Sequence, residues 1–337
     1  MTNINVGVIG YGYWGPNIVR NFFNAANCTV KKVADSRTPR LAMLAKAFPS
    51  IKGVTDANDI LDDTEIDAIV IATPVFTHYA LAKQALEKGK HVLIEKPMTS
   101  SVAEAEELIN LSIQKNLLLM VDHTFLYTGA VQKMKEIIEN QTIGTPRYFD
   151  SSRINLGLFQ PDINVLWDLA PHDISILIYL IKEMPASINA TGISHTRNNI
   201  ENIAYMTVNY DSDFIAHFTC SWTSPVKLRQ TLIGGDKKMI VYNDLEITDK
   251  VRIYDTGYSL KTEEDRKQIL VDYRVGDIYI PKLSGQEALS GVANDFIQSI
   301  ISQMEPLANA YVGMKVVQIL EASQESIKCN GREVKIK

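Results

Sequence analysis

Cysteine is scarce in this sequence, with three residues among 337. Cys28, Cys220 and Cys329 lie far apart along the chain. They match neither the paired spacing of a zinc site nor the dense pattern of a disulfide-stabilised domain. No cluster of His, Cys and Asp has metal-ligand spacing either. We therefore predict no metal and a reducing, cytoplasmic compartment.

Long apolar runs and an excess of basic residues are also missing. The most apolar run, residues 174–181, is much shorter than the ~20 residues that cross a bilayer. Residues 1–5 show no basic flank followed by an apolar stretch, so we expect no secretory signal and no membrane partner. With 34 Lys and Arg against 39 Asp and Glu, the net charge of -5 argues against a nucleic-acid-binding protein.

The chain is longer than one hydrophobic core usually serves, so we expect two domains. Up to residue 122, short runs rich in Val, Ile and Leu alternate with helical stretches, as in strands that are covered on both faces. The stretch 101–115 opens with Ser101-x-x-Glu104, a helix-capping pattern. This order predicts a doubly wound parallel sheet, and residues 1–122 are interpreted as a Rossmann dinucleotide-binding domain.

From about residue 145 the pattern changes to long strand-like runs joined by tight turns. Residues 204–210 and 214–222 indicate one antiparallel hairpin, and Gly234-Gly235-Asp236 indicates the turn of another. A helix is expected to begin near Pro171 and to run to Lys182, and two more are expected near the end. Residues 123–337 are therefore predicted to form an α+β domain. It is an open, mostly antiparallel β-sheet with helices on one face.

The first predicted strand is followed by Gly10-x-Gly12-x-x-Gly15 and then by an amphipathic helical stretch. Gly10 permits a tight turn, Gly12 lets a pyrophosphate approach the backbone, and Gly15 lets the helix pack closely on the strand. The helix N-terminus offers N–H groups and a positive dipole end to the phosphates. We expect this loop, with Tyr13 and Trp14, to bind a dinucleotide; a purely structural turn is the alternative.

The second predicted strand ends at Asp35. A carboxylate at this place accepts hydrogen bonds from the adenosine ribose and repels a 2′-phosphate, so it favours NAD over NADP. Arg37 complicates this choice, because it can stack on adenine or accommodate that phosphate. We predict NAD as the cofactor and keep NADP as the alternative. The structural alternative for Asp35 is an ordinary turn residue at a strand end.

Two further motifs, Ala72-Thr73-Pro74 and Glu95-Lys96-Pro97, end the fourth and fifth predicted strands. Both stand at the carboxyl edge of the sheet, where ligands bind in doubly wound folds. Lys96 can bond a ribose or substrate hydroxyl there, and its charge would stabilise a developing alkoxide. A solvated lysine after a strand is the structural alternative.

Together these motifs resemble the glucose–fructose oxidoreductase / inositol dehydrogenase / rhizopine-catabolism family, written Gfo/Idh/MocA. The resemblance spans essentially the whole chain. It implies an enzyme that oxidises or reduces one carbon of a sugar or polyol with NAD(P). It also implies a cis bond at Pro97. It implies further that the open-sheet domain, residues 123–337, binds the substrate and forms a homodimer or homotetramer. The residues that it places at the cofactor are Thr73, Pro74, His78, Glu95 and Lys96.

The segment from Trp167 to Asp173 carries the candidate acid/base. Pro171 suits the first turn of a helix, which would place His172 at the helix N-terminus, a position that favours the neutral base form of an imidazole. Asp168 could orient the ring, although His and Asp also cap helices for structural reasons. The resemblance matches both to the family signature D-x-x-x-H and implies an acid/base histidine assisted by the carboxylate. Ser175 stands where the family often has a second Asp, so that role is not transferred.

A finer resemblance points to a nucleotide-sugar branch that includes UDP-N-acetylglucosamine 3-dehydrogenases. Such enzymes make a 3-keto sugar for an aminotransferase, which is therefore a possible pathway partner. Val75 departs from the Asn that often follows the Thr-Pro pair. The segments that carry this resemblance are residues 14–17, 123–127, 153–157 and 168–172.

Four more side chains are candidates for contact with the substrate. Arg153 and Asn155 fall on the first strand of the open sheet, and the planar fork of an arginine suits a diphosphate. The alternative is an exposed strand residue that pairs with a nearby carboxylate. His123 and Tyr127 are expected to line the sugar pocket, or else to belong to a packed loop.

The sequence therefore predicts an NAD-dependent dehydrogenase that acts on a CH–OH group. The expected substrate is a small-molecule sugar, and the expected site is C3 of a UDP-N-acetylhexosamine-type nucleotide sugar. An inositol or free-sugar dehydrogenase and a keto-sugar reductase are the alternatives of the same class. A non-catalytic NAD(P)-binding regulator is the alternative of another class, and the presence of Lys96 and His172 argues against it.

Overall fold

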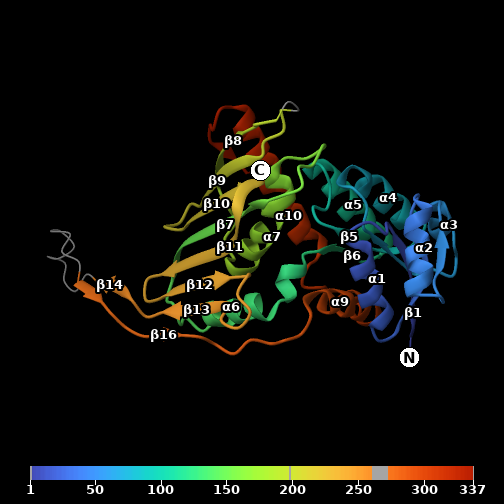
Figure 1. Cartoon of the computed structure of the whole chain (residues 1–337), viewed down its shortest axis with the longest axis horizontal. Coiled ribbons are helices and arrows are strands. Elements are labelled where there is room, and N and C mark those ends of the chain that lie inside the picture. The colour runs from blue at the N-terminus through green and yellow to red at the C-terminus, as the bar shows by residue number, and fades with distance from the viewer. Residues whose placement is uncertain (1, 197–198, 260–271, 337) are drawn as a thin grey trace. The chain divides into compact units, whose positions relative to one another are not determined.

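The computed structural model describes residues 2–196, 199–259 and 272–336 (Figure 1). The chain divides into two compact units, each built around a β-sheet. Within these described ranges, no helix has both the length and the apolar character that a membrane span needs.

The first unit is built from two separate stretches of the chain, Met1–Thr128 and Gln286–Glu321. The second unit is Gly129–Gly285 with Ala322–Lys337. The predicted division at residue 122 thus differs from the structure, because the chain returns to the first unit. The cause is packing between distant segments: the ring of Phe296 meets Phe22 edge-to-face, with centroids 6.1 Å apart.

The sheet of the first unit has six parallel strands in the order β3-β2-β1-β4-β5-β6. Their central residues are almost all buried, as expected for apolar runs without polar alternation. The strand order reverses between β1 and β4, the place where doubly wound folds bind their ligands. The strands are β1 (Ile4–Ile9), β2 (Cys28–Ala34), β3 (Lys52–Val54), β4 (Ala68–Ile71), β5 (His91–Glu95) and β6 (Leu119–Asp122).

Helices connect these strands and begin where the sequence indicates. The Ser101 hydroxyl caps α5 by accepting a hydrogen bond from the Glu104 N–H at 3.3 Å, which confirms the predicted capping pattern. The helices are α1 (Gly15–Asn24), α2 (Thr38–Ala47), α3 (Asn58–Leu61), α4 (His78–Glu87), α5 (Val102–Lys115) and α9 (Ala288–Ser302), with 3-10 turns η1 (Val75–Thr77) and η2 (Thr124–Tyr127). Helix α10 (Ala310–Lys328) contributes residues to both units.

The second unit is an open sheet of nine strands in the order β16-β13-β12-β11-β7-β10-β9-β8-β17. β7 and β10 pair in parallel, and the other neighbours pair antiparallel, including the two predicted hairpins. The strands are β7 (Pro146–Leu156), β8 (Ser187–Ile193), β9 (Ile203–Asn209), β10 (Ile215–Ser221), β11 (Thr223–Gly235), β12 (Met239–Asn243), β13 (Val251–Tyr254), β16 (Ile278–Tyr279) and β17 (Val334–Lys335). Two shorter strands, β14 (Gly257–Ser259) and β15 (Asp272–Arg274), pair with each other.

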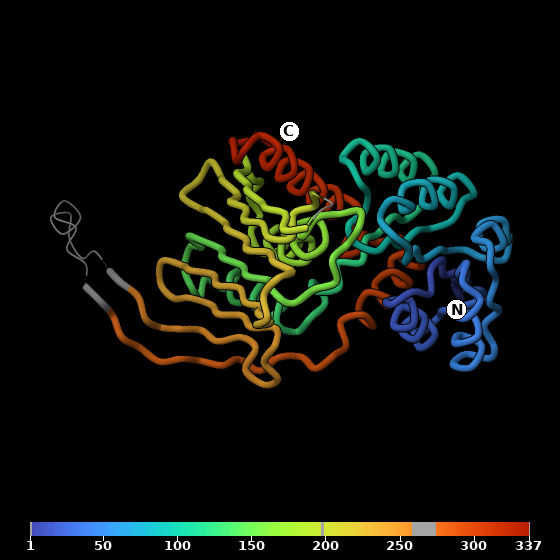
Figure 2. Tube along the Cα trace, turned by 45° about the horizontal axis from the view of Figure 1, so that its top comes forward, coloured from blue at the N-terminus to red at the C-terminus, as the bar shows by residue number. Residues whose placement is uncertain are grey.

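Helix α7 (Val165–Leu180) packs on β7, β9 and β10, and α6 (Gly129–Glu139) packs on α7. In Figure 2 the chain of this sheet is green at β7 and orange at β13 and β16, and β17 lies near the red end of the colour bar. The two units therefore have the predicted fold class: a parallel Rossmann sheet followed by a mostly antiparallel sheet with helices.

The predicted start of α7 at Pro171 is wrong. The helix begins after Asn164, whose side-chain oxygen accepts hydrogen bonds from the N–H groups of Leu166 and Trp167. Pro171 lies inside the helix. A proline is common in a first helical turn, but here the asparagine cap satisfies the free N–H groups a turn and a half earlier.

Candidate active site

The loop between β1 and α1 contains two glycines that the packing of the chain itself requires. Gly10 has a φ of 102°, a left-handed conformation, and a Cβ there would lie 2.3 Å from the Ala72 carbonyl oxygen. A Cβ on Gly15 would lie 2.7 Å from the Gly10 carbonyl oxygen. These two glycines therefore form the tight turn and let α1 approach the strand.

Gly12 is different, because the residues that the structure describes give no packing reason for it. Among the described residues, a Cβ at Gly12 would meet only the Arg37 guanidinium, at an ordinary 3.5 Å. The free space beside Gly12, at the positive end of α1, fits the backbone approach of a pyrophosphate. Tyr13, the next residue, is 89% exposed at the tip of the loop. This cradle fits the predicted dinucleotide.

Asp35 lies directly after β2 and is buried. Its carboxylate accepts hydrogen bonds from the Tyr11 N–H at 2.9 Å and the Arg37 N–H at 3.0 Å. The Arg37 guanidinium donates two more, both at 2.9 Å. Burial alone would raise the pKa of Asp35, but these hydrogen bonds outweigh it and lower the pKa to about 2. The carboxylate is therefore ionised and holds Arg37 beside the phosphate loop.

The turn after β4 is joined to the Glu95-Lys96-Pro97 turn by His78. Its Nδ1 lies 2.9 Å from the Pro97 carbonyl oxygen, and its Nε2 lies 2.8 Å from the Thr73 carbonyl oxygen. The imidazole is fully buried, and burial lowers its pKa. His78 thus holds the two turns together rather than facing a ligand with a free nitrogen. The Lys96–Pro97 peptide bond is cis, as predicted.

The last residues of β5 and β6 bring two carboxyl side chains to this edge. Glu95 and Asp122 are register partners on adjacent parallel strands. The Asp122 Oδ1 accepts a hydrogen bond from the Thr124 hydroxyl at 2.6 Å, and the Glu95 Oε2 accepts one from the Lys96 N–H at 3.2 Å. Lys96 follows Glu95, so the predicted lysine lies at the carboxyl edge of the sheet. The sequence analysis did not single out Asp122.

His123 and Tyr127, predicted to line a sugar pocket, both lie in the first unit, where His123 is buried and Tyr127 is half-buried. The Tyr127 hydroxyl donates to the Asp295 carboxylate at 2.6 Å, and Asp295 also accepts from the Leu307 N–H at 2.9 Å. This network attaches η2 to α9 and favours the packed-loop interpretation of Tyr127. Neither ring nitrogen of His123 has a hydrogen-bond partner among the residues that the structure describes. Burial lowers the His123 pKa to about 3, so the ring is neutral.

In the second unit, Asp168 and His172 lie four residues apart on α7 and therefore share one helix face. His172 is half-buried and lies well inside the helix, so the expected position at the helix N-terminus is wrong. The Asp168 carboxylate accepts a hydrogen bond from the Trp222 indole at 2.9 Å. Trp222 is a neighbour that sequence reasoning missed, because it lies on a distant segment after β10.

Arg153 does not present its fork to a ligand. It is 4% exposed, and its guanidinium donates to both oxygens of Asp173, at 2.6 and 2.7 Å. Burial would lower the pKa of Arg153, but the Asp173 charge outweighs it and raises the pKa. The structure thus favours the alternative of an arginine paired with a carboxylate, although the pair is buried. Asn155, two residues further along β7, is half-buried on the same face.

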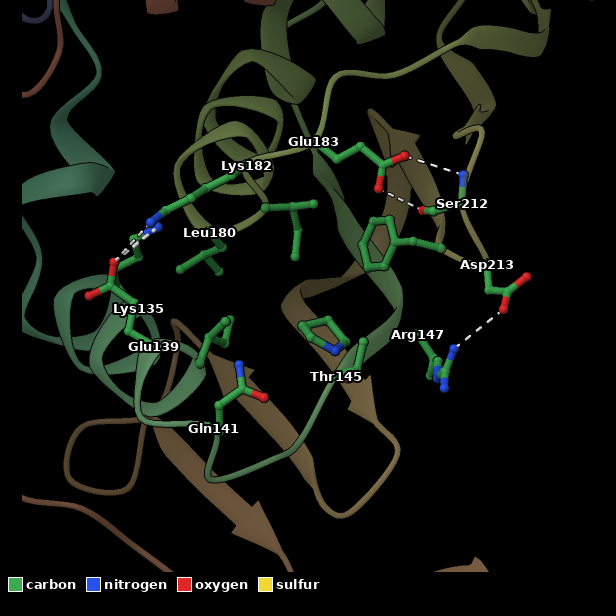
Figure 3. Close-up of a pocket in the computed structure, with 14 residues that line it drawn as sticks. Lys135, Glu139, Gln141, Thr145, Arg147, Leu180, Lys182, Glu183, Ser212 and Asp213 are labelled. Carbon is green, nitrogen blue, oxygen red and sulfur yellow. Dashed lines mark hydrogen bonds and ion pairs between the residues drawn. The ribbon is translucent and has the colours of Figure 1, made fainter.

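A pocket of about 730 Å³ lies elsewhere in the second unit, between the ends of α6 and α7 and the β9–β10 turn (Figure 3). Its charged side chains pair with one another: Arg147 with Asp213 at 3.6 Å, and Lys135 with Glu139 at 3.6 Å. It contains no residue predicted to bind cofactor or substrate. The described part of the chain also holds no cluster of three His, Cys, Asp or Glu side chains that could bind a metal.

Comparison with known families defines the class of protein. Residues 4–123 match the model of an oxidoreductase family with an NAD-binding Rossmann fold, and residues 131–241 match the GFO/IDH/MocA C-terminal domain. The chain therefore belongs to the Gfo/Idh/MocA family of NAD-binding oxidoreductases, as the motifs predict.

Two curated relatives are dehydrogenases of different substrates. The chain is 32% identical over 218 residues to the UDP-N-acetylglucosamine 3-dehydrogenase of Acidithiobacillus ferrooxidans, which covers 62% of this chain and 64% of that enzyme. It is 24% identical over 349 residues to the NADP+-dependent scyllo-inositol 2-dehydrogenase IolW of Bacillus subtilis, covering 96% and 94% of the two chains. The chain thus spans less than two thirds of the first relative and nearly all of the second.

Solved structures agree with the fold. The structure of the Acidithiobacillus ferrooxidans UDP-N-acetylglucosamine 3-dehydrogenase superposes with a TM-score of 0.80 at 22% identity, covering 98% of this chain and 100% of that one. An oxidoreductase from Agrobacterium radiobacter, solved with NAD+, L-tartaric acid and magnesium, superposes with a TM-score of 0.82 at 19% identity and covers 99% of both chains. At these identities the likeness concerns the fold alone.

Proposed function

We propose that this chain is an NAD-dependent dehydrogenase that oxidises a CH–OH group of a sugar, at C3 of a UDP-N-acetylhexosamine-type nucleotide sugar. The observation that carries the proposal is the cradle at the phosphate loop. Gly12 has open space that nothing in the described packing explains, and the ionised Asp35 lies at the end of the adjacent strand. This combination suits a dinucleotide with free ribose hydroxyls.

The choice of NAD rests on the charge of Asp35. Its carboxylate would repel a 2′-phosphate, and the Arg37 guanidinium that could attract one is already paired with it. Gly12, Tyr13 and Trp14 would hold the pyrophosphate. Thr73, Pro74 and Lys96, at the carboxyl edge, would hold the nicotinamide end.

The bound nicotinamide would supply the hydride acceptor, and the chain would supply proton handling and orientation. We assign to His172 the removal of the hydroxyl proton, to Asp168 the orientation of His172, and to Lys96 a hydrogen bond to the reacting oxygen. The Trp222 indole, which donates to Asp168, would keep that carboxylate in place. Asn155, on the open sheet, is the further candidate for sugar contact.

Three observations bear on the substrate. The relative named as a UDP-N-acetylglucosamine 3-dehydrogenase supports a nucleotide sugar. The burial of Arg153 against Asp173 removes the predicted diphosphate contact, and the relative that aligns along nearly the whole chain acts on scyllo-inositol. An inositol dehydrogenase is therefore the second candidate.

The two candidates are separated by NADH fluorescence. The purified chain with NAD is given UDP-, dTDP- and GDP-sugars beside free inositols and hexoses, with a carbonyl trap that draws the reaction forward. A signal confined to a UDP-sugar supports the nucleotide-sugar proposal. A signal confined to inositols replaces it with the polyol candidate, and cofactor binding without turnover on any substrate favours a regulator.

Three wider expectations belong to this proposal. The 3-keto product would be consumed by an aminotransferase, and the enzyme would form a homodimer or homotetramer through its open sheet. We also expect a cytoplasmic location, which the small number and wide spacing of the cysteines support. Light scattering tests the oligomer.

A further inference from the structure

Glu95 and Asp122 bring two carboxyl groups together at the end of adjacent parallel strands. They are direct register partners, so their side chains leave the sheet on the same side. One oxygen of each has a donor: Thr124 for Asp122 and the Lys96 N–H for Glu95. The other two oxygens, Glu95 Oε1 and Asp122 Oδ2, are buried and accept no hydrogen bond within the described part of the chain.

Two ionised carboxylates in this arrangement would repel each other without a donor between them. Like charges that share a site cannot both ionise easily, whereas one proton held between the groups satisfies both free oxygens. A hydrogen bond between two carboxyl groups requires one of them to be protonated, and Glu95 Oε1 and Asp122 Oδ2 are the two buried oxygens left for it.

We propose that Glu95 and Asp122 share a single proton, and that the one negative charge left on the pair holds the Lys96 ammonium at the cofactor edge. Both carboxyl residues are then positioning residues for Lys96. The assignment deepens the proposed function, on which the catalytic use of Lys96 rests. The shared proton itself does not depend on that function.

The groups around Glu95 and Asp122 favour one negative charge on the pair over two. Burial, and the charge of Asp122, raise the pKa of Glu95, and burial raises that of Asp122. His123 adds no positive charge, because its pKa of about 3 keeps it neutral. Lys96 is therefore the cation that balances the pair. Lys96, Thr124 and Trp14 favour the ionised form of Asp122, whereas Lys96 acts on His123 and Asp122 acts on Tyr127.

The first test counts charges on the folded full-length chain and needs no substrate. Capillary electrophoresis at neutral pH compares the wild type with Glu95→Gln, Asp122→Asn and the double variant. Because either carboxyl alone keeps one charge, each single variant should leave the net charge unchanged, and the double variant should raise it by one unit. Glu106→Gln, an exposed matched control, should raise it by one unit on its own.

A one-unit change in either single variant overturns the shared proton, because both groups would then be ionised. No change in the double variant overturns it as well, because the pair would then be neutral. The single variants are nearly isosteric with the wild type, so they test for a doubly ionised pair even where the double variant does not fold.

The second test concerns Lys96 and is also independent of turnover. Acetylation of Lys96 by acetic anhydride at mildly alkaline pH is followed by mass spectrometry, with exposed Lys115 as the internal reference. Loss of the neighbouring negative charge should speed labelling of Lys96 about tenfold or more in the double variant, and leave the single variants near the wild-type rate. An unchanged rate in the folded double variant would show that the pair does not hold Lys96. If no sugar is oxidised in the NADH assay, the charge count and the acetylation rate of Lys96 still test the shared proton.

Discussion

Asp35 and Arg37 form a two-pronged pair in which guanidinium Nε and Nη2 each donate to one carboxylate oxygen at 2.9 Å. Asp35 is buried while the Arg37 side chain is 57% exposed, so the carboxylate is the fixed member of the pair. A ribose that bonds Asp35 must share the carboxylate with Arg37 or displace it. Cofactor selection therefore depends on both residues together.

Asp35→Ala should weaken NADH binding about tenfold or more, because hydrogen bonds to a charged group contribute about 1.5–3 kcal/mol. NADPH should lose less affinity, since the repulsion of its 2′-phosphate is removed and Arg37 is released. Fluorescence titration with both cofactors measures the ratio. Arg37→Ala serves as the control and should retain the preference for NADH. A preference that stays the same in Asp35→Ala would contradict the ribose assignment.

Stability in acid should depend on the same carboxylate. The pKa of Asp35 falls from 3.8 to about 2, so its ionised form stabilises the folded chain above the higher value. This contribution should disappear as the pH falls through about 2. In urea titrations, the wild type should lose its stability advantage over Asp35→Ala within that window. A constant difference between the two proteins from neutral pH downward would be inconsistent with this pKa.

Gly12 and Gly15 should respond in opposite ways to the same small substitution. Gly15→Ala drives a Cβ against the Gly10 carbonyl and should destabilise the chain by about 1–3 kcal/mol. Gly12→Ala should leave the free energy of unfolding within about 0.5 kcal/mol and weaken NADH binding instead. Thermal unfolding and cofactor titration of the two variants test this contrast. If Gly12→Ala binds NADH as tightly as the wild type, the assignment of the pyrophosphate to this loop is wrong.

His172→Ala should lower kcat on the accepted substrate about 10²–10⁴-fold, as expected for the loss of a general base, and leave NADH binding unchanged. His217→Ala is the matched control in the same unit, because His217 is a half-exposed histidine that faces Asp150 at 3.7 Å. Stopped-flow turnover gives kcat, and cofactor titration gives the affinity for NADH. Wild-type turnover by His172→Ala would exclude His172 as the base.

Arg153→Ala should destabilise the chain by about 3–5 kcal/mol, because it leaves the Asp173 charge buried without its partner. Joint replacement by Arg153→Met and Asp173→Leu should restore most of that loss. Urea unfolding measures both effects. If Arg153→Ala is as stable as the wild type and has a raised KM for a UDP-sugar, Arg153 binds the substrate diphosphate instead of stabilising the fold.

The sequence predicts those parts of the molecule that depend on local pattern. The glycine loop, the cap at Ser101 and the two hairpins follow from residue type and spacing within a few positions, and the structure has them. Partners that arise from distant segments could not be predicted. Asp173 for Arg153, Trp222 for Asp168 and Asp295 for Tyr127 each lie on another element. The start of α7 was misplaced because proline and asparagine signals compete there, and the asparagine cap prevails.

The return of α9 to the first unit has a consequence for the chain as it is made. Arg20 on α1 pairs with Glu287, 267 positions later, and the ring of Phe22 on the same helix packs against Phe296. While the ribosome is still adding the second unit, the apolar face of α1 has no cover from α9. The Rossmann unit therefore reaches its final packing only after residues 129–285 of the second unit have been synthesised.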